Sequence, residues 1–243
     1  MSVAAPTTAG LLASVLLLGP GLGSAAAAPL AHQGSVVVSG EWDPHWSSLT
    51  LTPAVGASTG VGPSLNWMEP ELGSGGHGGH GGHGGGGGGG GGHGQELWSL
   101  LSVTQRLQRW NGDHYQANLW AGVGAGLLTL FPTTAGVGDN RPAWSPWAQV
   151  DWETRRLYLG ASARWFQAPS IGRLMTSARA GVALTGADYH RLQPWLMLEA
   201  RTMEGLQQGV EITPLLRVLH RRLLAEAGIS TTGSVRVTVS YTF

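Results

Sequence analysis

The sequence predicts an all-β protein: an antiparallel, transmembrane, up-and-down β-barrel of about ten strands. Two observations support this fold class. Apolar residues alternate with polar or charged residues at period two over stretches of about ten residues, as in strands that face two different environments. Beyond the N-terminal segment, no apolar run reaches the roughly 18 residues of a membrane-spanning helix.

Composition excludes several classes of protein. The 243 residues carry 14 basic and 14 acidic side chains, and every basic side chain is arginine. Without a basic excess, the chain is not expected to bind nucleic acid or other polyanions. The absence of cysteine excludes disulfide scaffolds, thiolate metal sites and cysteine nucleophiles.

The N-terminus is predicted to be a secretory signal peptide covering residues 1–28. An apolar segment at 11–18 is followed by the helix-breaking Gly19-Pro20-Gly21, and small residues at 25–28 suit cleavage. As a membrane anchor, this segment is too short and interrupted to cross about 30 Å of hydrocarbon. Residues 29–46 are interpreted as a periplasmic lead-in, because one extra strand at 35–42 would break the even strand number of bacterial barrels.

The strands are predicted from alternation, taken in order along the chain. Between 115 and 127 the odd positions are mostly apolar, and similar patterns recur around 144–153, 157–165, 174–184 and 192–201. The ten predicted strands are 47–56, 96–110, 114–130, 143–153, 156–166, 173–185, 190–202, 209–220, 222–230 and 234–243. A twelve-strand solution, with one pair miscounted, stays open. The barrel domain is therefore predicted to span 47–243.

A transmembrane barrel explains the two faces of these strands. The apolar face would contact lipid and the charged face the lumen, while closure pairs every backbone group within the hydrocarbon. Eleven Trp in a chain with only three Phe suit aromatic girdles at the two membrane interfaces. Tight connections at 111–114, 153–156, 187–190 and 220–222 would share one end. The other connections, longer on average, would share the opposite end.

The last strand carries a resemblance. Residues 234–243 end in Phe243, with Tyr241 and Val239 on the same face. This strand resembles the C-terminal signature of Gram-negative outer-membrane β-barrels, a class rather than a family. The resemblance implies an outer-membrane location, contact with outer-membrane lipid and recognition by the barrel assembly machinery. A secreted β-sandwich or lipocalin-like barrel, with apolar faces inward, accounts less well for the recurring charged faces.

The predicted lumen mixes both signs of charge. Its charged residues are Asp151, Glu153, Arg164, Arg179, Glu199, Arg201, Glu211, Arg217, Glu226 and Arg236. Interleaved charges in a narrow barrel can pair across it and seal it. The sequence therefore favours a plugged interior over a channel.

A histidine-containing glycine block at 73–94 is the one segment with suggestive chemistry. It places His77, His80, His83 and His93 in polyglycine. Imidazole is a common ligand for Zn, Ni and Cu, and glycine would let the rings converge on a weak, exchangeable site. The alternative is a disordered loop with incidental histidines.

The leading functional hypothesis is therefore an outer-membrane barrel that binds a divalent metal at the cell surface, in metal uptake or resistance. A structural or adhesive barrel and a narrow channel are the alternatives. No enzyme is expected: no Ser or Asp pairs with the block histidines, and Asp151 and Glu153 are explained as structural carboxylates paired with lumen arginines. No cofactor is required, and the oligomeric state is left open.

Overall fold

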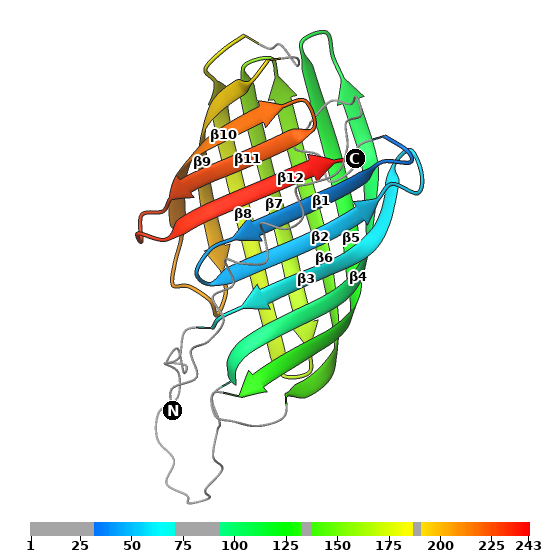
Figure 1. Ribbon diagram of the computed structural model, residues 1–243, viewed down its shortest axis with the longest axis vertical. Helices are drawn as coiled ribbons and strands as arrows, with labels where there is room; N and C mark the ends of the chain where they lie inside the picture. Colours follow the sequence, from blue (N-terminus) through cyan, green and yellow to red (C-terminus); the bar gives the residue numbers. More distant parts are fainter. Residues whose placement is uncertain (1–31, 71–92, 133–137, 187–190) are drawn as a thin grey trace, which may run out of the picture.

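The computed structural model describes residues 32–70, 93–132, 138–186 and 191–243. These residues form a closed antiparallel barrel in which sequence neighbours pair and β1 closes against β12 (Figure 1). The strands are β1 (Val36–Trp42), β2 (Trp46–Pro53), β3 (Thr59–Met68), β4 (His93–Asn111), β5 (Tyr115–Pro132), β6 (Asp139–Thr154), β7 (Leu157–Ala168), β8 (Ile171–Ala183), β9 (Gln193–Met203), β10 (Glu211–His220), β11 (Leu223–Ile229) and β12 (Val235–Thr242). Within the described residues, no helix is long and apolar enough to cross a membrane.

The described barrel has twelve strands, so the predicted count of about ten is wrong. The predicted lead-in at 29–46 is wrong from Val36 onward, because β1 is a wall strand paired with both β2 and β12. The other missing strand is β3, which joins β2 to β4. The two omissions are linked. Without β3, counting β1 as a wall strand gives an odd number of strands, and β1 was excluded for that reason. The predicted signal peptide at 1–28 lies outside the described residues and stays a prediction.

The barrel has two different ends. The terminal end holds the start of β1, the end of β12 and the short turns after β4, β6 and β10. The loop end holds the connections 43–45, 169–170, 204–210 and 230–234, together with the end of β3 and the start of β4. The predicted grouping of the connections at two ends is therefore confirmed for the described residues. That the loop end faces the outside of the cell stays a prediction.

The outer face of the wall is apolar. Leu101, Leu127, Leu159 and Leu198 are between 50% and 61% exposed, although each lies within a paired strand. The residues next to them along each strand point inward, and several are buried, such as Ser102 at 8% exposure and Leu128 at 0%. Because water would penalise so many exposed leucines, this face fits contact with lipid.

Aromatic pairs mark both interfaces. At the loop end, Trp67 lies 5.3 Å from Phe131 and Trp144 lies 6.0 Å from Trp165, measured between ring centroids. At the terminal end, the rings of Tyr241 and the C-terminal Phe243 lie 4.8 Å apart, and Tyr115 stacks on Trp152 at 6.5 Å. These rings are on outward positions of their strands, as expected for aromatic girdles.

Glycines on the inner face of β5 make room for large lumen side chains. A Cβ at Gly122 would lie 2.3 Å from Nε1 of Trp147, and one at Gly124 would crowd Leu100. The glycine run at 122–126 is thus explained by packing inside the barrel.

Candidate functional site in the barrel lumen

The predicted metal ligands lie largely outside the described residues. His77, His80 and His83 belong to the segment 71–92, and His93 begins β4, where its backbone is in register with Pro132. Within the described part of the chain, no group of three or more His, Asp or Glu side chains is arranged to hold a metal. Metal binding by the block therefore stays a prediction.

The predicted lumen charges lie on the inner face. Seven of the ten are buried: Asp151, Glu199, Arg201, Glu211, Arg217, Glu226 and Arg236. The remaining three, Glu153, Arg164 and Arg179, are partly buried. Alternation alone identified these positions, because side chains along a strand point to opposite faces in strict order.

An ion-pair cluster fills the lumen towards the loop end between β8, β9, β12 and β1. The guanidinium of Arg201 contacts Glu41 at 2.8 Å and forms a short contact with Asp43. Arg236 pairs with Glu199 at 2.6 Å. Sequence reasoning missed Glu41 and Asp43 because they lie in and after β1. The period-two pattern that places Val37, Ser39 and Glu41 on one face was the signal that could have revealed them.

Arg179 joins this cluster to a second ion-pair centre. Its guanidinium lies 2.9 Å from Glu199 and 3.1 Å from Glu226, and Glu226 also accepts from Nε of Arg217 at 2.6 Å. The two carboxylates are about 1% exposed, so these pairs are desolvated. A buried carboxylate is tolerated only with such charged partners. The arginines and glutamates therefore hold one another across the wall from β8 to β12.

An apolar cluster fills the lumen beside these ion pairs near the loop end. Its fully buried members are Met68, Trp98, Leu128, Leu130, Phe166, Met203 and Leu206. Leu206 comes from the connection between β9 and β10, whose backbone folds inward through bonds from the Leu206 and Gln207 amides to the Met203 carbonyl. Next to this cluster, Arg173 donates through Nε to Glu96 at 2.8 Å. Buried side chains of this cluster and of the ion pairs therefore occupy the loop half of the lumen.

A cavity of about 330 Å³, lined by many polar side chains and by apolar ones such as Val37, Trp147 and Leu224, lies inside the barrel beside this half. Its hydroxyl lining comprises Ser39, Ser48, Thr50, Thr52, Ser64, Ser102, Thr104, Ser162, Ser177, Thr238 and Ser240, together with the phenol of Tyr158. Its charged lining comprises Arg164, Arg179, Arg217, Glu41 and Glu226. Most of the hydroxyls lie on β1 to β4 and β12, whereas the arginines lie on β7, β8 and β10. The cavity therefore has a neutral hydroxyl wall and an arginine-bearing wall.

The hydrogen bonds of Asp151 differ from the predicted pairing with a lumen arginine. Its carboxylate accepts from Asn118 at 2.7 Å and from Trp120 Nε1 at 2.9 Å, and among the described residues no arginine lies within 4.0 Å of it. The expected pairing with a lumen arginine is therefore wrong for this carboxylate. The Asp151 carboxylate instead accepts hydrogen bonds from uncharged donors. The Glu153 carboxylate accepts a hydrogen bond from the side-chain amide of Gln116 at 3.5 Å.

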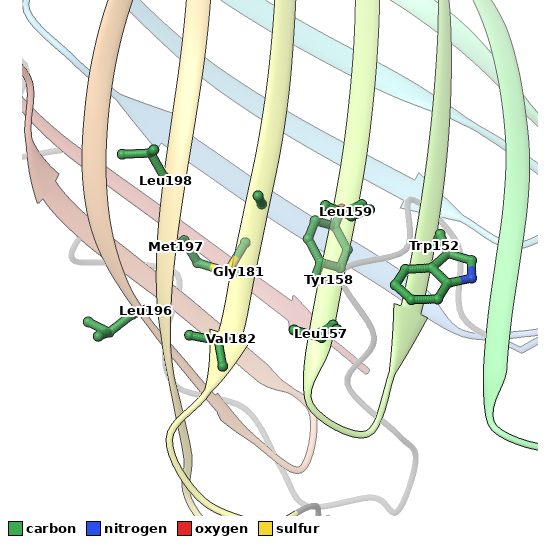
Figure 2. Close-up of a pocket in the computed structure, with 10 residues that line it drawn as sticks. Trp152, Leu157, Tyr158, Leu159, Gly181, Val182, Leu196, Met197 and Leu198 are labelled. Atoms are coloured by element: carbon green, nitrogen blue, oxygen red, sulfur yellow. The ribbon is translucent and has the colours of Figure 1, made fainter.

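A second concave region lies on the outside of the wall. Figure 2 shows it between β6, β7, β8 and β9, where a groove of about 400 Å³ is lined by Trp152, Leu157, Leu159, Val182, Leu196 and Leu198, among others. The lining is almost wholly apolar. The groove belongs to the lipid-facing surface, so the lumen cavity is the candidate site for a polar solute.

Comparison with known proteins adds little detail. No protein-family model matches the chain, and no curated protein matches it. Among solved structures, it is similar to a KdgM porin in complex with disordered oligogalacturonate, with 8% identity, a TM-score of 0.43, and coverage of 86% of this chain and 98% of that one. It is also similar to a loop-deletion mutant of OmpT, an outer membrane protein of Vibrio cholerae, with 9% identity, a TM-score of 0.29, and coverage of 86% and 97%.

These likenesses concern the barrel fold and carry no argument about what this chain binds. The apolar outer face, the two aromatic girdles and the closed antiparallel wall of the described residues are features of an outer-membrane β-barrel. The chain is therefore an outer-membrane β-barrel protein.

Proposed function

We propose that the protein is a narrow outer-membrane channel for small hydrophilic solutes, closed at its loop end in the conformation described. The observation that carries the proposal is the polar cavity of about 330 Å³ inside the wall. Barrels of about eight strands are filled by side chains, and those of about 16 enclose an aqueous channel. A twelve-strand wall lies between these limits, which suits a narrow lumen.

The composition of the cavity supports a solute path. Packing for stability alone would favour apolar side chains, as in the neighbouring cluster of Trp98 and Phe166. Hydroxyl groups and arginines instead hold water or a polar solute. The strand count also weakens the argument for a sealed barrel, since that argument assumed about ten strands.

The closure depends on side chains and one connection rather than on a separate domain. Leu206 lies in the connection 204–210, in which Gly205 and Gly209 both adopt positive φ. A connection moves at lower free-energy cost than a paired strand. We therefore place the gate at Leu206 and its neighbour Phe166, beneath the loop end.

Single-channel conductance in planar bilayers tests the proposal. The variant Phe166→Ala combined with Leu206→Ala shortens two buried members of the closing cluster. Its matched control is Trp165→Ala, which removes an aromatic ring from the lipid-facing side of the same strand. Far-UV circular dichroism and the mobility of unheated protein on gels would verify that each variant folds.

We expect small or rare conductance steps from the unmodified protein and from Trp165→Ala, and frequent, larger steps from the lumen variant. Absence of conductance from all three folded proteins would overturn the channel and favour the sealed structural or adhesive barrel. The ion pairs that cross the lumen are the observation that favours this second candidate.

A further inference from the structure

We infer that the lumen cavity contains a binding site for one compact oxyanion, a carboxylate or phosphate group, with Arg164 as its principal ligand. This inference deepens the proposed function by naming the solute chemistry, and it rests on that function only for its role in transport. Binding itself can be measured without conduction.

Arg164 is the cavity-lining arginine whose charge is least compensated. Its Nε donates to Ser145 Oγ at 3.0 Å, and its guanidinium carbon lies 4.6 Å from the centroid of the Phe166 ring. Among the described residues, no carboxylate lies within 4.0 Å of it, and its terminal nitrogens donate no hydrogen bond. A guanidinium has further N–H donors on these two nitrogens, so Arg164 keeps unused donors on the side best suited to an anion.

The neighbouring arginines differ in this respect. Arg179 is paired with Glu199 and Glu226, and Arg217 is paired with Glu226 at 2.6 Å. Arg164 lines the same cavity and is only partly exposed. A partly enclosed charge without a counter-charge loses hydration free energy that an anion would restore.

The geometry of the guanidinium sets the ligand class. Two terminal nitrogens in one plane match two oxygens of a carboxylate or phosphate, which is why arginine binds these groups bidentately. Ser162 and Ser177 line the cavity on adjacent strands and lie 2.9 Å apart, measured between their hydroxyl oxygens. Because one hydroxyl of this pair keeps a free hydrogen, it can donate to a further oxygen of the anion.

The carboxylates that line the cavity do not compete for Arg164. Glu226 is held by Arg179 and Arg217, and Glu41 lies 2.8 Å from Arg201. The space also suffices: 330 Å³ accommodates an oxyanion and several waters, since a water molecule occupies about 30 Å³. A compact anion therefore fits beside Arg164 without breaking an ion pair of the wall.

Isothermal titration calorimetry on the full chain, refolded in non-ionic detergent at constant ionic strength, tests the site. Sodium phosphate and sodium acetate are the two probes, and they distinguish a tetrahedral from a planar oxyanion. The variants are Arg164→Gln, which removes the charge, and Arg164→Lys, which keeps it without the planar fork. Arg156→Gln, at the exposed turn between β6 and β7, is the control.

We expect binding of at least one probe with one site per chain. The affinity should fall at least tenfold in Arg164→Gln, fall less in Arg164→Lys and stay unchanged in Arg156→Gln. Equal affinities in the unmodified protein and in Arg164→Gln, or no binding of either probe to the folded unmodified protein, would overturn the site. If Arg164→Gln does not fold, an affinity in Arg164→Lys equal to the unmodified one overturns it. Binding without conductance would instead overturn the channel and leave the anion site standing.

Discussion

Arg236 on β12 and Glu199 on β9 form an ion pair of 2.6 Å inside the barrel, and both side chains are at most 2% exposed. The strands that carry them are separated by β10 and β11, so the pair ties non-adjacent parts of the wall together. Glu199 also forms an ion pair with Arg179 at 2.9 Å, so this one carboxylate pairs with two arginines.

Removing this anchor should destabilise the barrel. We expect Glu199→Gln to lower the free energy of unfolding by about 3–5 kcal/mol, because the buried Arg236 and the partly buried Arg179 both lose a carboxylate partner. Urea titration in detergent measures this change. Glu153→Gln is the control, since Glu153 is partly exposed and its amide partner lies 3.5 Å away. Equal effects of the two substitutions would show that the buried pair contributes nothing special.

The membership of β3 in the wall makes a separate prediction. Leu65 is 44% exposed on the outer face of β3, opposite Leu49 and Ser99. An arginine here would enter the hydrocarbon, so Leu65→Arg should cost about 2–4 kcal/mol if the position lies near the bilayer midplane. Unfolding by guanidinium from lipid vesicles measures the cost. Val55→Arg, in the exposed connection before β3, should be neutral. If Leu65→Arg leaves the free energy of unfolding unchanged, residues 59–68 do not form a lipid-facing wall strand.

Packing inside β5 makes a third prediction. A Cβ at Gly122 would lie 2.3 Å from Nε1 of Trp147 and 2.5 Å from the backbone oxygen of Val103. Gly122→Ala should therefore displace the indole and cost about 1–3 kcal/mol, as overpacking does elsewhere. Near-ultraviolet circular dichroism should report the displaced Trp147. The neighbouring outward position provides the control Ala121→Val, whose added methyl groups meet lipid and should change neither signal.

The fourth prediction concerns metal binding by the histidine-containing glycine block at 73–94, which calorimetric titration with metal ions can check. Zn, Ni and Cu are expected to bind the refolded barrel weakly and exchangeably through His77, His80, His83 and His93. Replacing all four by glutamine, with the loop length unchanged, should abolish the calorimetric signal. Affinities that depart from the Irving–Williams order would indicate a shaped site. Unchanged binding in the glutamine variant would place the metal elsewhere or leave the block without a role.

Local sequence pattern determined the wall and its two faces. The apolar and charged positions of β5 to β12 follow from period-two alternation, because a strand sends successive side chains to opposite sides. Arg201 and Glu226 could therefore be assigned to the lumen without a structure. The aromatic girdles followed for the same reason, since Trp144 and Trp165 lie on lipid-facing positions near strand ends.

Closure and pairing were decided by the tertiary structure. Whether β1 is a lead-in or a wall strand depends on a partner far along the chain, since Glu41 is in register with Thr238 of β12. The same holds inside the lumen, where the stagger of the closed barrel brings Arg236 to Glu199 but brings no carboxylate of the described residues to Arg164. The period-two sequence pattern shows only that a charged side chain points into the lumen. Which charges meet is set by closing all strands at one register, and that closure leaves Arg164 facing the cavity.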